Sequence, residues 1–168
     1  MDIAIIPTDK IPARFYQRHL YEEDFVIATR ARHPFAKMPT LTRYCEMQHL
    51  VVSLMGDPHG FVDEFLAQQG HKRRIALTVP NFMFALAIIA ETDLIAALPR
   101  RFAAMYGARF GVVSLEAPLP LPNYPVNTVA STAAMMDAGV AWLFGVLQGA
   151  ELLALKNERR SSLRKQRV

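Results

Sequence analysis

The sequence predicts an α/β fold in which one α/β lobe is complete and part of a second lobe is joined to it by two crossover segments. Residues 74–107 show the pattern of strand, helix, strand and helix. Two segments, near residues 17–28 and 118–126, are extended or rich in proline and pass between units. A hydrophobic content of 52% with 20% charged residues is typical of a globular chain, so both parts are expected to be folded.

The central segment predicts a βαβ unit. Alternating apolar residues over 75–79 suit a pleated strand, which Pro80 ends because its ring removes an amide donor and fixes φ. Asn81 is the expected N-cap of a helix over 82–90, which is apolar on all sides and is therefore expected to be buried. A second apolar strand over 94–98 follows. This spacing predicts a right-handed crossover between parallel strands, with ligands at their carboxyl ends.

The other elements follow from local patterns. In chain order we expect strands at 2–6, 49–53, 112–115 and 126–130, an extended stretch over 15–30, and helices at 41–47, 61–69, 100–108 and 137–155. Thr40 is placed to open the first of these helices, and Gly70 to end the second. The prolines of 118–125 predict a stiff linker.

Bulk properties exclude several classes. With 168 residues the chain can form one core or two small lobes, and Cys45, its single cysteine, excludes an internal disulfide and fits a reducing compartment. No apolar run approaches the roughly 20 residues that cross a bilayer. The N-terminus lacks the basic start and cleavage site of a secretory signal. We therefore expect a cytoplasmic protein with no membrane partner.

The net charge of +4 is unevenly distributed. Residues 156–168 carry six Lys or Arg and one Glu, a net +5, which leaves −1 for all other residues. Two interpretations of this basic tail stay open, a solvated chain end and a segment weakly attracted to phosphate.

No enzyme motif is present, and neither a metal nor a cofactor is expected. The five histidines are scattered without metal-ligand spacing. His59 precedes a helix, so both a loop-surface position and a ligand contact stay open. Ser53 ends an apolar strand before a glycine-containing loop, where it can bind a ligand, form a turn or, least of all, act as a nucleophile. Asn81 is a helix cap that can also meet a ligand, and Phe82 is either a core residue or a pocket wall.

The ordered set of segments resembles the effector-binding domain of LysR-type transcriptional regulators. The resemblance rests on DIAII, LYEEDFVIATRARHP, HLVVS with its glycine loop, RIALTVPNF and DLIAALPRR, and it covers residues 1 to about 150. It implies a fold like type 2 periplasmic binding proteins, with two α/β lobes joined by two crossover strands. The implied division is 1–21 for a remnant of the first lobe with the first crossover, 22–120 for the second lobe, 121–155 for the return to the first lobe, and 156–168 for the tail.

The resemblance also implies a function. In this family a small organic acid or aromatic metabolite binds between the lobes and changes how a homodimer or tetramer binds DNA. Thr29 is expected on the first crossover segment, and Pro7 at the end of the first-lobe strand. The implied effector contacts are Pro7, Thr29, Ser53, Gly56, Pro80, Asn81, Phe82, Leu98 and Pro99.

Part of the family pattern has no counterpart in this sequence. The winged helix-turn-helix, the linker helix and the front half of the first lobe are absent, so we expect a regulator fragment that reaches DNA only through a missing N-terminal domain. Three alternatives are a solute-binding protein of similar fold, a truncated fragment without ligand activity, and a small enzyme that uses Ser53 or His59.

Overall fold

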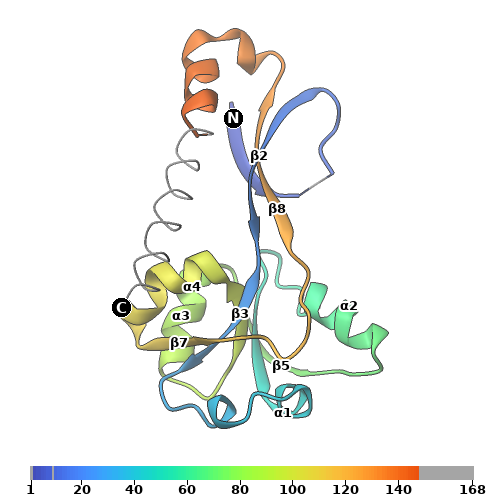
Figure 1. The fold of residues 1–168 in the computed structure, drawn as a ribbon, viewed down its shortest axis with the longest axis vertical. Helices are drawn as coiled ribbons and strands as arrows, with labels where there is room; N and C mark the ends of the chain where they lie inside the picture. Colours follow the sequence, from blue (N-terminus) through green and yellow to red (C-terminus); the bar gives the residue numbers. More distant parts are fainter. Residues whose placement is uncertain (1, 9, 148–168) are drawn as a thin grey trace, which may run out of the picture. The chain divides into compact units, whose positions relative to one another are not determined.

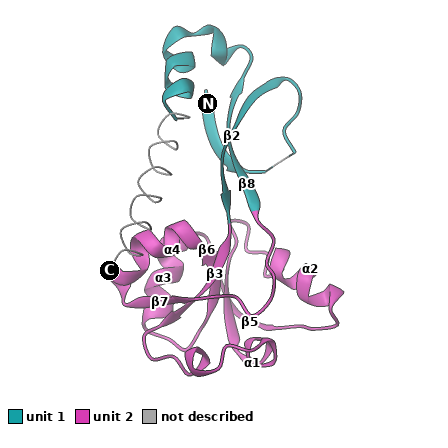
Figure 2. Ribbon diagram, in the orientation of Figure 1, with its two compact units in different colours: residues 1–23, 124–168 teal, residues 24–123 magenta. Residues whose placement is uncertain are grey.

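The computed structural model describes residues 2–8 and 10–147 (Figure 1). The chain divides into two compact units, Met1–Glu23 with Tyr124–Val168 and Asp24–Asn123 (Figure 2). The sequence places these divisions two or three residues earlier. Of the predicted final helix, residues 138–147 are helical, whereas its remainder and the basic tail lie outside the described residues.

Unit 1 contains one three-stranded antiparallel sheet. Its strands, in spatial order, are β1 (Ile3–Pro7), β8 (Tyr124–Ser131) and β2 (Phe15–Glu23). Because β8 is central, Val126, Val129 and Ala130 are buried although this unit has few other elements. A short 3-10 turn, η3 (Ala134–Met136), connects β8 to the final helix.

Unit 2 contains five strands, with both parallel and antiparallel pairings. They are β3 (Phe25–Arg30), β4 (Gln48–Val52), β5 (Arg74–Val79), β6 (Ala96–Pro99) and β7 (Val112–Leu115). Strand β3 pairs antiparallel with β6 and β7, whereas β4 pairs parallel with β5 and meets Ile95, just before β6, through a parallel bridge at His49. Strands β5 and β6 of the predicted βαβ unit therefore run parallel, but they are not paired, because β4 lies between them.

Helices cover both faces of the strands of unit 2. They are η1 (Pro34–Lys37), α1 (Leu41–Glu46), α2 (Phe61–Gln68), α3 (Phe82–Ala90), α4 (Arg100–Tyr106) and η2 (Gly107–Phe110). Helices α3 and α4 contribute to one apolar cluster, and α1 and α2 to another. In the described part of the chain, no helix is both long and apolar enough to cross a membrane.

Three expectations about burial are corrected by the structure. Helix α3 buries Leu86 fully, but Met83 is 44% and Phe84 is 54% exposed, so the helix is not buried on all sides. Leu77 is 38% exposed, although the alternation predicts that it is buried with Val79; its strand β5 pairs only with β4 among the described strands. Leu119 in the proline-rich segment is buried in the second apolar cluster of unit 2, so this segment packs as well as connects.

Candidate functional site

The parallel strands of unit 2 bring several predicted site residues to one edge. Strands β4, β5 and β6 run in the same direction, so the residues that follow them lie at a common carboxyl edge. The backbone N–H of Ser53 donates to the carbonyl oxygen of Val79 at 2.8 Å, which holds Ser53 beside Pro80. Ser53, Pro80 and the turns that follow them therefore form one continuous surface.

The turn after β4 carries two exposed apolar residues that the sequence reasoning missed. Gly56 adopts φ of +78°, a conformation that favours glycine, and its N–H donates to the carbonyl oxygen of Ser53 at 3.3 Å. Between them Leu54 and Met55 are 82% and 90% exposed. The sequence signal that could have identified them is a pair of adjacent apolar residues in an otherwise polar loop. Such a pair on a turn is more often used to bind a ligand or partner than to pack in the core.

The turn after β5 combines a helix cap with an aromatic wall. The side-chain oxygen of Asn81 accepts a hydrogen bond from the backbone N–H of Phe84 at 2.9 Å, so the predicted N-cap is confirmed. Phe82 packs against the first apolar cluster and contacts Phe102, with ring centroids 5.4 Å apart. It also lines a cavity, so both interpretations of Phe82 hold.

The Asn81 cap gives a stability prediction. Asn81→Ala is expected to lower the free energy of unfolding by about 1 kcal/mol, because it leaves the Phe84 N–H without its acceptor. Asn81→Asp keeps an acceptor and adds negative charge at the helix N-terminus, so it should retain most of the stability. Urea denaturation of both variants measures the difference. An equal loss in both would contradict a capping role.

The end of β6 supplies a buried residue and an ion-pair network. Leu98 is fully buried in the first apolar cluster, whereas Pro99 pairs with Phe25 and precedes α4. Arg100 then binds the carboxylate of Glu116 with two hydrogen bonds of 2.7 and 2.8 Å and also binds Asp24. The hydrogen bonds that Arg100 donates to Glu116 and Asp24 raise the pKa of Arg100, and the bonds that Glu116 accepts from Arg100 lower the pKa of Glu116. Sequence reasoning missed this network because its members lie far apart in the chain.

Two predicted residues are not brought to the carboxyl edge. Thr29 is fully buried, and its hydroxyl donates to the carbonyl oxygen of Arg30 at 3.1 Å. The sequence places it on the first crossover segment; in the structure it lies on β3, within unit 2. Strand β3 begins at the edge with Phe25, so Thr29 lies about 13 Å further along it. Pro7 ends β1 in unit 1, where it pairs with Val126.

A cavity of about 170 Å³ lies beneath this edge within unit 2. Its wall is mostly apolar and includes three phenylalanine rings. It is lined by Phe25, Leu50, Val51, Val52, Gly60, Phe61, Val62, Arg73, Phe82 and Ala97. The rings of Phe25 and Phe61 are tilted against each other, with centroids 4.6 Å apart.

The charged member of that wall belongs to a buried polar cluster. The guanidinium of Arg73 donates to both carboxylate oxygens of Asp63 at 2.8 and 2.7 Å and to the hydroxyl of Tyr44 at 3.2 Å. Burial raises the pKa of Tyr44 to about 12, although Arg73 opposes this shift. Burial alone would raise the pKa of Asp63, but hydrogen bonds from Arg73 and the Gly60 N–H outweigh it and lower that pKa. At neutral pH the cluster is therefore an ion pair capped by a neutral phenol.

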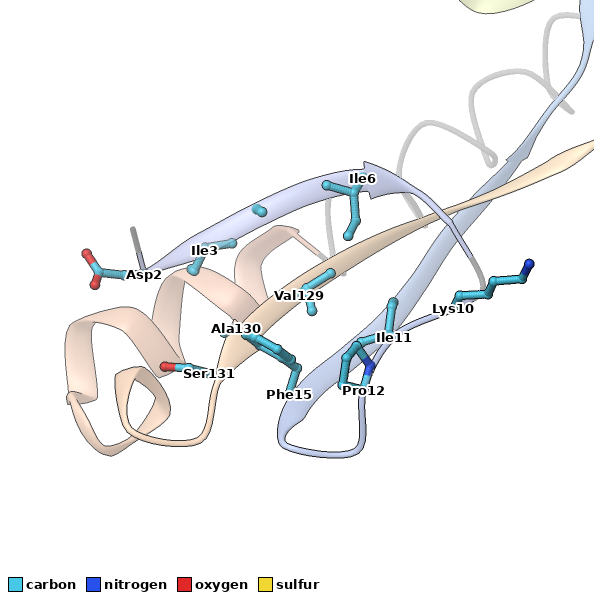
Figure 3. A pocket seen from close by; sticks show the side chains of 11 residues that line it. Asp2, Ile3, Ile6, Lys10, Ile11, Pro12, Phe15, Val129, Ala130 and Ser131 are labelled. Carbon is cyan, nitrogen blue, oxygen red and sulfur yellow. The ribbon is translucent and has the colours of Figure 1, made fainter. Parts of the chain in front are cut away.

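Unit 1 has an apolar hollow of its own, of about 210 Å³ (Figure 3). Ile3 and Ile6 on β1, Val129 on β8 and Phe15 at the start of β2 contribute to its wall. Ile11 and Pro12 lie at its side, with the polar residues Asp2, Lys10 and Ser131 among its lining. None of the predicted site residues lines it.

The family model and the curated relatives that match this chain indicate the same protein family. The family model described as the LysR substrate binding domain matches residues 1–151. The HTH-type transcriptional activator NagR of Ralstonia sp is 35% identical over 144 residues, which are 85% of this chain and 48% of that protein. The chain thus spans about half the length of this relative.

Solved structures confirm the predicted fold. The regulatory domain of MexT, a transcriptional activator in Pseudomonas aeruginosa, is 28% identical with a TM-score of 0.76, covering 88% of this chain and 72% of that one. The effector binding domain of QuiR, solved in complex with shikimate, shares the fold at 15% identity and a TM-score of 0.69, covering 88% of this chain and 69% of that one. The architecture is that of LysR regulatory domains, which resemble type 2 periplasmic binding proteins.

Proposed function

Because this chain belongs to the LysR substrate-binding-domain family, we propose that it senses a small organic acid or aromatic metabolite for a transcriptional regulator. The observation that carries the proposal is the carboxyl edge of unit 2, where the end of β4 and the N-termini of α2 and α3 line an apolar cavity. Parallel strand ends of this kind are where open α/β folds bind ligands. The relatives are regulators, which supports binding rather than catalysis.

The proposed contacts follow from exposure at this edge. Ser53, Gly56, Pro80 and Asn81 are part-exposed or exposed in the two adjoining turns, and Pro99 is half-buried at the end of β6. Leu98 is fully buried and supports the end of β6 from within the core, whereas Thr29 is buried away from this edge. Pro7 stays a prediction from the family resemblance, as do a homo-oligomeric state, a cytoplasmic location and DNA contact through a separate domain.

Ligand-dependent melting of the purified chain tests the proposal. A panel of small organic acids and monocyclic aromatics is added, and a compound at 100 times its Kd should raise the free energy of unfolding by roughly 2.7 kcal/mol. Ser53→Ala is expected to reduce that stabilisation. Ser114→Ala, at an exposed position of β7, is the matched control and should leave it unchanged.

Two results would overturn the proposal. One is the absence of any ligand-dependent shift, both in this chain and in a complete regulator that carries it. The other is an equal loss of ligand-dependent stabilisation in the Ser53 and Ser114 variants, which would show that ligand binding does not depend on the carboxyl edge.

A further inference from the structure

The cavity of unit 2 has the size and lining of an aromatic subsite. A dry cavity of about 150 Å³ in a protein core accepts benzene, and this cavity measures about 170 Å³. The phenylalanine rings at 25, 61 and 82 line it, and aromatic walls pack favourably against an aromatic ring. A ring of one benzene unit fits this space.

A second observation concerns Arg73, which lines the same cavity with a side chain only 3% exposed. A guanidinium has five N–H groups. Asp63 and Tyr44 accept three of them, one from each guanidinium nitrogen. The other two N–H groups can donate to a ligand oxygen in the cavity that Arg73 lines.

The charge of the cluster indicates which ligand group, a carboxylate or a hydroxyl, can accept a hydrogen bond from Arg73. Asp63 already neutralises Arg73 through two hydrogen bonds. A second carboxylate in the cavity would bury an anion beside Asp63, which costs several kcal/mol. A hydroxyl oxygen can accept from Arg73 without that cost.

We propose that the cavity between the carboxyl end of β4 and the N-termini of α2 and α3 binds a benzene-sized ring whose hydroxyl oxygen accepts a hydrogen bond from Arg73. This inference rests on the proposed function and specifies the ligand class of its site. The effector is accordingly a phenol-type aromatic compound, and any carboxylate that it carries stays at the solvent-exposed opening.

Phenol and toluene are the probes, and NMR titration of the methyl groups of Leu50, Val52 and Val62 in the full chain is the measurement. Phenol should shift these signals saturably. Toluene has the same ring without the oxygen, so it should bind about tenfold more weakly, as expected for one hydrogen bond to a charged group. No saturable shift with phenol would overturn the subsite, and equal affinities would overturn the contact with Arg73.

Ala97→Leu tests the position of the ring, because the larger side chain fills the cavity from β6. Phenol affinity should fall at least tenfold. Ala104→Leu adds the same volume at an exposed position of α4 and should change nothing. If Ala97→Leu fails to fold, Val52→Ile narrows the same cavity by one methylene and should weaken phenol binding severalfold.

The outcomes separate this inference from the proposed function. A ligand whose stabilisation depends on Ser53 but not on the size of residue 97 would overturn the subsite and leave the sensing function intact. If no member of the panel stabilises the chain or the complete regulator, both fall together.

Discussion

Asp63→Ala is expected to destabilise the protein by about 3–5 kcal/mol, because it leaves the buried guanidinium of Arg73 without its counter-ion. The pair is bidentate, and the Arg73 side chain is only 3% exposed, so solvent does not replace the lost carboxylate. The substitution also removes the acceptor for the Gly60 N–H at the start of α2. Urea denaturation followed by circular dichroism measures the loss.

An exposed ion pair of the same unit provides the control. Asp93 pairs with Arg30 at 2.6 Å, but its side chain is 73% exposed, so Asp93→Ala should cost less than about 1 kcal/mol. The double variant Asp63→Ala with Arg73→Met should recover most of the stability lost in Asp63→Ala, since the uncompensated charge is then absent. If Asp63→Ala and Asp93→Ala lose the same free energy of unfolding, burial of the Asp63–Arg73 pair does not increase the cost of removing its carboxylate.

Local features were the ones that the sequence predicted well. Asn81 and Thr40 cap their helices through hydrogen bonds to the backbone N–H three residues later. Gly70 adopts φ of +73° after α2, as a helix-ending glycine should. Each of these signals depends on residues within one helical turn, so the pattern alone carries the information.

Features that depend on distant residues were not predictable. Arg100 binds Asp24, which is 76 positions away, and nothing in the sequence near Arg100 indicates this partner. The burial of Thr29 depends on its neighbours β6 and β7, which follow much later in the chain. Alternation also does not reveal that β5 has a single neighbouring strand, where Leu77 is exposed. Family resemblance supplied the fold, but it did not supply these contacts.

In the candidate site, too, the features with local sequence signals were predicted and those that depend on distant residues were not. The turns after β4 and β5 were identified because strand ends and helix starts have local signatures, and the structure joins them through the bond from Ser53 to Val79. The cavity beneath them was not predicted. It needs Phe25, Phe61 and Arg73 to converge from separate elements, and Arg73 bears no sequence mark that distinguishes it from Lys72 or Arg74.

Acidification from pH 7 to pH 4 is expected to cost about 3 kcal/mol of stability through His49 alone. His49 is fully buried, and one ring nitrogen lies 2.8 Å from the carbonyl oxygen of Tyr44, to which it donates. The other ring nitrogen, Nδ1, is buried without a hydrogen-bond partner in the described part of the chain. Burial lowers the pKa of His49 from its ordinary value of 6.5 to about 4, although the bond to Tyr44 opposes this shift.

The direction of the effect follows from which state binds the proton. Between pH 6.5 and pH 4 the unfolded chain protonates this imidazole while the folded protein excludes the proton, so stability falls as the pH falls through this window. His49→Gln can still donate to Tyr44 but does not titrate. Its stability should therefore fall about 3 kcal/mol less than that of the native protein over this range. His71→Gln, at an exposed position, should behave like the native protein. Parallel stability curves for the native protein and His49→Gln in urea melts from pH 7 to pH 4 would contradict this prediction, because they would mean that the buried imidazole accepts its proton without cost.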